Sequence, residues 1–254
     1  MTRALRAAIA CSLLVALVAV TVPEAQRRYG RTESYYGNVE YNGRFTFVRM
    51  SYNMGLGRGF RGQPPWAHDY PDGERNFLRI LTAVSNVTAN VDETSIMTFS
   101  DPEMFKFPVI YLVEPGYWMM NDTDVEGLRA YLSKGGFLIV DDFPQQQWYN
   151  FEQQIARVFP EKRWIEIDIN HPIFHSFFTI DPHEVPQMYD LGGPPMFYAL
   201  FEDNDPKSRM LIIANYQSDL SEFWEYVERG FSPTPETNEA YKVGINQFIY
   251  GITH

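Results

Sequence analysis

Two adjacent carboxylates follow an apolar run of the kind that forms a buried strand. The run covers residues 137–140, and Asp141 and Asp142 come directly after it. Carboxylates in this position can bind a hard cation, accept hydrogen bonds from sugar hydroxyls, or form half of an acid–base pair. Because successive strand residues point to opposite faces, a regular strand would not aim both at one ligand. The structural alternative is that Asp142 caps the next helix and Asp141 is solvated.

Polar side chains follow two other apolar runs in the same way. Glu114 comes after residues 108–113, and Asn215 comes after residues 210–214. In parallel sheets, ligands bind beyond the carboxyl ends of the strands, so we expect these side chains and the acidic doublet to line one crevice. A pairing of Glu114 with Asp141 would resemble the carboxylate pair of glycosidases. The alternatives are a solvated loop glutamate and a turn-forming asparagine.

Two histidines, His171 and His175, are four residues apart in the sequence HPIFH. The zinc-protease pattern requires glutamate directly after the first histidine, and Pro172 stands there instead. Proline favours the first position of a helix, which makes His171 a helix cap. A metal site that joins His171 to Asp141 or Asp142 is the functional interpretation, and a cap with a packed His175 is the structural one.

A glycine-rich stretch at residues 55–62, GLGRGFRG, precedes a polar and aromatic segment. Bare backbone amides bind anions, but no helix and no Gly-Lys-Ser/Thr follow, so a nucleotide loop is not supported. We expect a lid over the crevice instead. Arg49, at the end of the first predicted strand, is expected to pair with a rim carboxylate, since buried charges are rarely unpaired. The segment behind the lid that would edge the crevice contains Trp66, His68, Asp69 and Tyr70.

Short apolar strands alternate with amphipathic helices along the chain. This alternation predicts an α/β fold with a mostly parallel sheet and helices on both faces. The predicted strands are residues 44–50, 95–99, 108–113, 137–140, 164–169 and 210–214. The predicted helices are residues 72–85, 122–134, 152–159, 220–227 and 239–249, with a short one at 171–177.

The first 25 residues are typical of a secretory signal peptide. Arg3 and Arg6 precede an uncharged, mostly apolar stretch at residues 7–22, which is short for a membrane span. The alternative is an uncleaved N-terminal anchor. We therefore expect an extracytoplasmic protein, periplasmic or secreted, with a linker at residues 26–42 and a single α/β domain at residues 43–254.

Charge and cysteine content exclude several classes of function. The net charge of −11 argues against nucleic acid and anionic lipid as partners, so membrane contact is expected only through an uncleaved N-terminal segment. The only cysteine is Cys11, within that segment. Residues 26–254 therefore offer no disulfide, no thiolate zinc site and no cysteine nucleophile.

Several stretches resemble a bacterial family, domain of unknown function 4159, over most of the chain. They are FTFVRMSYN, DYP, PVIYLVEPGY, YLSKGGFLIVDDF, HPIFHSFF, LIIAN and VGINQFIYGIT. The piece LRAYLSKGGFLIVDDF is also similar to the class I glutamine amidotransferase-like superfamily, which implies a three-layer flavodoxin-like fold. The catalytic cysteine of that superfamily would fall at about Asp141. Because a carboxylate cannot replace a thiolate that attacks an amide, cysteine-dependent amide transfer is excluded.

Two functional hypotheses follow. The first is a non-catalytic ligand-binding or assembly module of the cell envelope, with an unidentified envelope ligand or protein as partner. The alternative is a metal- or carboxylate-dependent hydrolase that acts on envelope glycans. No cofactor is predicted beyond a candidate divalent metal. Convergence of Asp141, Glu114 and a histidine on one point would favour the enzyme, whereas pairing with Arg49 would not.

Overall fold

A computed structural model describes residues 38–54 and 63–254. The predicted signal peptide and most of the predicted linker lie outside the described residues. So does the glycine-rich stretch at residues 55–62 that was expected to form a lid.

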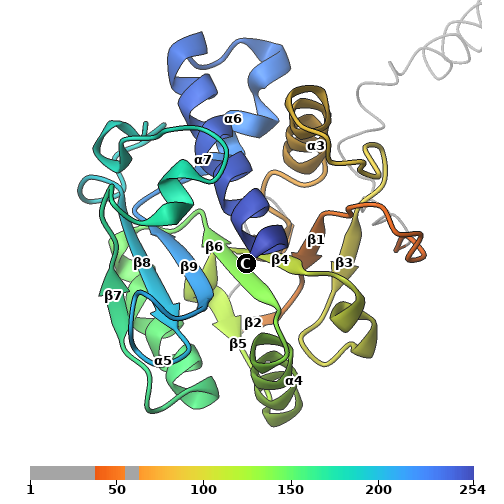
Figure 1. The fold of residues 1–254 in the computed structure, drawn as a ribbon, viewed down its shortest axis with the longest axis vertical. Helices are drawn as coiled ribbons and strands as arrows, with labels where there is room; N and C mark the ends of the chain where they lie inside the picture. The colour runs from red at the N-terminus through yellow and green to blue at the C-terminus, as the bar shows by residue number, and fades with distance from the viewer. Residues whose placement is uncertain (1–37, 55–62) are drawn as a thin grey trace, which may run out of the picture. The chain divides into compact units, whose positions relative to one another are not determined.

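The described residues contain a seven-stranded sheet with the order β3-β1-β4-β6-β9-β8-β7 (Figure 1). Strands β3, β1, β4, β6 and β9 run parallel to one another, whereas β8 is antiparallel to both β9 and β7. The predicted parallel pairing of residues 109–113 with the strand before the acidic doublet is confirmed, because Val113 is in register with Asp141. The strands are β1 (Val48–Met50), β3 (Ser95–Met97), β4 (Val109–Val113), β6 (Phe137–Asp141), β7 (Trp164–Glu166), β8 (Met196–Phe201) and β9 (Met210–Tyr216).

Helices cover both faces of the sheet, as the sequence predicts for an α/β fold. Alternate residues of each central strand enter opposite cores, so that Ile139 packs with α3, α6 and α7 while Leu138 packs with α4 and α5. The α-helices are α3 (Asp72–Val84), α4 (Asp122–Ser133), α5 (Trp148–Val158), α6 (Leu220–Glu225) and α7 (Thr234–Thr253).

Short elements complete the described chain. An antiparallel pair, β2 (Asn53–Met54) and β5 (Trp118–Met119), forms a second small sheet. The 3-10 helices are η3 (Pro65–Ala67), η4 (Pro102–Lys106), η5 (Pro115–Tyr117), η6 (Gln145–Gln147), η7 (Pro172–His175), η8 (Pro182–Glu184) and η9 (Val227–Arg229). Within residues 38–54 and 63–254, we find no helix with the length and apolarity that crossing a membrane requires.

Helix α4 leads the chain into β6 and begins and ends where its sequence predicts. The side chain of Asn121 accepts a hydrogen bond from the backbone N–H of Asp124 at 2.9 Å, and Asp124 accepts one from the N–H of Asn121 at 3.2 Å. This reciprocal pair satisfies two free donors of the first turn. Gly135 follows the helix with φ +110°, which a larger residue rarely adopts.

The structure differs from the predicted elements at several places. Strands β1 and β7 are shorter than the predicted strands at residues 44–50 and 164–169. Strand β8 was not predicted, and it adds the antiparallel hairpin with β9. Helix α5 begins at Trp148 rather than residue 152, because Trp148 and Phe151 pack with Trp164 in the core. Helix α7 extends beyond the predicted 239–249 at both ends.

Candidate functional site

Four acidic or basic side chains from three segments meet near the carboxyl ends of β4 and β6. His68 and Asp69 lie between η3 and α3, Glu114 follows β4, and Asp142 follows β6. The parallel strands β4 and β6 therefore deliver two of the carboxylates to one rim, as the sequence predicts. Asp69 and Asp142 are buried.

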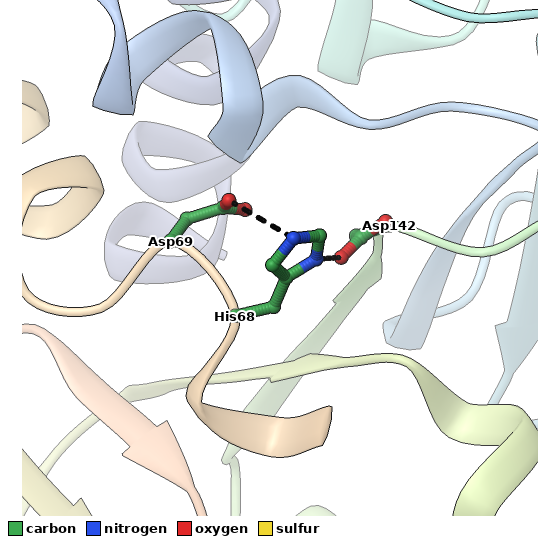
Figure 2. Close-up of side chains that lie close together, drawn as sticks. All are labelled: His68, Asp69 and Asp142. Carbon is green, nitrogen blue, oxygen red and sulfur yellow. Dashed lines mark hydrogen bonds and ion pairs between the residues drawn. The ribbon is translucent and has the colours of Figure 1, made fainter. Parts of the chain in front are cut away.

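The His68 ring lies between two carboxylates (Figure 2). Its Nδ1 is 2.7 Å from Asp142 Oδ2, and its Nε2 is 3.8 Å from Asp69 Oδ1. The side chain of His68 is 41% exposed, so the site is open to solvent. The hydrogen bond to Asp142 raises the pKa of His68 to about 10, with the Asp69 charge also raising it and burial opposing.

Glu114 completes the acidic surroundings of His68. Its Oε1 lies 3.8 Å from His68 Nδ1, and its other oxygen accepts a hydrogen bond from the side chain of Gln147. The Tyr52 hydroxyl donates to the backbone carbonyl of Glu114 at 2.6 Å and so fixes this turn. Burial raises the pKa of Glu114 to about 7, and the nearby Asp142 charge adds to the effect.

All three carboxylate residues of the site have a left-handed backbone conformation. The φ angles are +62° at Asp69, +51° at Glu114 and +53° at Asp142. Left-handed conformation costs a non-glycine residue ~1 kcal/mol, and such strain gathers at functional sites. Within the described residues only two other non-glycine residues, Asn204 and Gln217, share this conformation.

One carboxylate oxygen at the site has no hydrogen-bond partner. The Ser221 hydroxyl donates to Asp69 Oδ2 at 2.5 Å, while Asp69 Oδ1 is buried and accepts none. The side chain of Asp69 is fully buried, and burial raises its pKa well above the ordinary value. A buried acceptor without a partner is costly, so Oδ1 is suited to a ligand atom.

Arg49 anchors the backbone of the segment that contains His68. Its Nη1 donates to the carbonyl oxygens of His68 at 2.8 Å and Trp66 at 3.1 Å, and its Nε pairs with Glu74 of α3. The prediction that Arg49 pairs with a rim carboxylate is therefore wrong. Alternation along β1 points Arg49 to the face that α3 covers, where Glu74 meets it.

Asp141 is fully buried beneath α6, away from the expected solvated or ligand-facing position. Its Oδ2 accepts hydrogen bonds from the Tyr111 hydroxyl at 2.6 Å and from the backbone N–H groups of Leu220 and Ser221 at 2.9 and 3.2 Å. Its Oδ1 accepts from Asn215 at 3.0 Å. Asp141 thus joins β4, β6 and β9 to the start of α6, and burial raises its pKa to about 6.

Asn215 lies beside Asp141, as expected from the two strand exits, but it is also fully buried. Its amide exchanges two hydrogen bonds with the amide of Gln247 in α7, at 3.1 and 2.6 Å. This arrangement couples the sheet to α7. Tyr70 is buried as well, with its hydroxyl 3.5 Å from that of Thr94.

His171 lies at the opposite end of the strands from Asp141. Its ring contacts Phe201, which pairs with Met210 at the start of β9, whereas Asp141 stands at the end of β6. The candidate metal pair of His171 and Asp141 is therefore wrong. His171 Nδ1 accepts the backbone N–H of Ile173 at 3.2 Å, which is the predicted cap of a short helix.

The histidine of the site is His68, which the sequence suggested only as an edge of the crevice. One ligand atom each from His68, Asp69 and Asp142 lies within 4.8 Å of the other two. One imidazole nitrogen with two carboxylate oxygens suits zinc or manganese. The sequence signal that could have identified this site is the adjacent pair His68-Asp69. It places two kinds of metal ligand side by side, directly before a Tyr-Pro turn.

The family model of domain of unknown function 4159 matches residues 46–252, which span the sheet and every site residue named above. The chain belongs to this family, as its sequence stretches suggested. Among curated proteins, none matches this sequence.

Proposed function

We propose that this protein binds a divalent cation through His68, Asp69 and Asp142 and acts as a non-catalytic ligand-binding module. The observation that carries the proposal is Asp69 Oδ1, a buried carboxylate oxygen without a hydrogen-bond partner, 3.8 Å from a solvent-exposed histidine. A cation at this point would satisfy the oxygen and neutralise two buried carboxylates.

The competing interpretation needs no metal, because a protonated His68 already bridges the two carboxylates. Metal binding requires a neutral imidazole, so a cation must displace a proton from His68. The two interpretations differ in what added metal does. A bridging imidazolium is indifferent to zinc or manganese, whereas a metal site is stabilised by them.

A binding role is preferred to glycan hydrolysis by a pair of carboxylates. The sequence offered Asp141 and Glu114 as a carboxylate pair, but Asp141 is fully buried and has four hydrogen-bond donors of its own. It is not available to a substrate. That leaves Glu114 without the second carboxylate the hydrolase hypothesis assigned to it.

The proposal includes a fold assignment and a location. Parallel central strands with helices on both faces support a flavodoxin-like, class I glutamine amidotransferase-like fold. The resemblance would put that superfamily's nucleophile at about Asp141, and the next residue, Asp142, has a left-handed backbone conformation directly after β6. The signal-like sequence of residues 1–25 supports a role in the bacterial cell envelope, with an envelope ligand or protein as partner.

Thermal unfolding with added cations tests the proposal. At a cation concentration of about 100 times Kd, binding stabilises the folded state by ~2.7 kcal/mol. This corresponds to a rise in Tm of ~5–10 °C for a domain of this size. We expect such a rise with Zn²⁺ or Mn²⁺, confirmed as direct binding by calorimetry.

Three variants locate the effect. His68→Ala and Asp142→Asn should abolish the rise, and asparagine tolerates the left-handed position of Asp142. His183→Ala removes an exposed histidine in η8 and is the matched control, which should retain the full rise. An unchanged Tm in the unsubstituted chain with all cations, or an equal rise in His68→Ala, contradicts the proposal.

A further inference from the structure

A second group of ligand atoms adjoins the proposed cation site. Glu222 and Glu225 lie three residues apart in α6, which places them on one face of the helix. One oxygen each from Glu222, Glu225 and Asp69 lies within 4.8 Å of the other two. Asp69 therefore belongs to both groups, with His68 and Asp142 in one and the two α6 glutamates in the other.

We propose that the site holds two divalent cations, with the Asp69 carboxylate bridging them. This inference rests on the proposed function and extends it with a second cation between Asp69, Glu222 and Glu225. A bridging carboxylate uses both of its oxygens. Asp69 Oδ1 faces His68 and accepts no hydrogen bond, whereas Oδ2 accepts one from the Ser221 hydroxyl and keeps a second lone pair for the cation of the α6 group. Paired cations in proteins stand ~3.5–4 Å apart, a spacing that one carboxylate can bridge.

Within the described ranges, neither glutamate of the second group forms an ion pair with a lysine, arginine or histidine, although the charges of Arg229 and His68 act on Glu225 from farther away. Glu222 Oε1 accepts a hydrogen bond from the Tyr189 hydroxyl at 2.7 Å. Glu222 is buried and Glu225 is half-buried, so their charges are poorly solvated. A divalent cation would compensate both, as carboxylate clusters do with magnesium or manganese.

The hydrogen bonds of α6 hold this second group in place. Asp141 accepts the N–H groups of Leu220 and Ser221, which fixes the first turn of α6 against β6. The hydroxyl of Ser221 binds Asp69 Oδ2 at 2.5 Å, which ties α6 to the bridging residue. The two halves of the proposed centre are thus held together before any cation binds, which lowers the ordering cost of binding.

The number of bound manganese ions tests the inference, because Mn²⁺ suits both ligand sets. We expect calorimetry of the purified full chain to give two Mn²⁺ per chain. Electron paramagnetic resonance should show the signal of two coupled ions. The double variant Glu222→Gln/Glu225→Gln should bind one ion without coupling. Asp69→Asn should weaken binding of both ions at least tenfold.

The matched control is Glu236→Gln/Glu239→Gln, a pair with the same spacing in α7. It should retain two coupled ions, and circular dichroism should confirm that every variant is folded. A single ion that the α6 variant still binds overturns the two-cation inference and leaves the proposed function standing. Two uncoupled ions, or two ions in the α6 variant, also overturn the inference. No bound ion in the unsubstituted chain overturns the proposed function itself.

Discussion

The adjacent residues Asp141 and Asp142 should have opposite roles, and Asp141→Ala shows the difference most clearly. This substitution leaves four buried donors without an acceptor: the Tyr111 hydroxyl, the Asn215 amide and two backbone N–H groups of α6. Each such donor costs ~1–2 kcal/mol, so the loss is ~6 kcal/mol. We therefore expect a stability defect rather than a binding defect.

Part of that loss is offset. Burial raises the pKa of Asp141 from 3.8 to about 6, so its ionised form at pH 7.5 is disfavoured in the folded state. The difference corresponds to ~3 kcal/mol, which alanine relieves. The net expectation for Asp141→Ala is a decrease of ~3 kcal/mol in the free energy of unfolding.

Asp141→Asn provides the matched comparison. Asparagine keeps an oxygen for Tyr111 and the two α6 N–H groups, and it carries no charge to desolvate. Its NH2 group would face Asn215, whose amide can turn together with that of Gln247 to present an oxygen. Hydrogen bonds to a neutral oxygen are weaker than those to a carboxylate, which cancels most of the relieved charge cost. We therefore expect Asp141→Asn to lie within ~1 kcal/mol of the unsubstituted chain.

Urea unfolding at pH 7.5, followed by circular dichroism and tryptophan fluorescence, measures both variants. The expected order of midpoints places Asp141→Ala well below the other two proteins. Equal midpoints for alanine and asparagine would refute the interpretation of Asp141 as a hydrogen-bond hub. A folded, stable Asp141→Ala that no longer binds Zn²⁺ would instead make Asp141 a ligand.

Two further predictions concern pH and the buried arginine. The folded-state pKa values of Asp141 (about 6), Glu114 (about 7) and His68 (about 10) all exceed their ordinary values, so each group contributes stability that is lost as pH rises through them. Burial lowers the pKa of His171 to about 4, which acts in the opposite direction below pH 6.5. The Tm of the cation-free protein should therefore fall from pH 7 to pH 9, and a Tm that rises over this range contradicts the reasoning. Arg49→Met leaves Glu74 buried and unpaired, which should cost ~3–5 kcal/mol in urea unfolding, and a cost below ~1 kcal/mol would count against the pair.

The architecture could be predicted from the sequence because its signals are local. Apolar runs of strand length and the capped, glycine-terminated α4 each specify their own element. Parallel pairing then places residues 114 and 142 at one rim without further information. Strand β8 was missed because an antiparallel strand, here between β9 and β7, gives no βαβ alternation to detect.

The composition of the site could be predicted only in part, because it depends on contacts between distant segments. His68 reaches Asp142 across 74 positions of sequence, and Asp69 reaches Ser221 across 152. The face of the sheet to which each strand residue points could have been predicted from the alternation of strand residues. The alternation that places Ile139 under α6 also places Asp141 there, and it leaves Asp142 for the rim. The partner of Arg49 required knowing which helix covers that face.

A crystal structure grown with Zn²⁺ would test the central claim most directly, through an anomalous difference map at the zinc edge. We expect a peak ~2.0–2.2 Å from one ring nitrogen of His68 and from carboxylate oxygens of Asp69 and Asp142. A map without a peak there, and with His68 still hydrogen-bonded to Asp142, would contradict the claim.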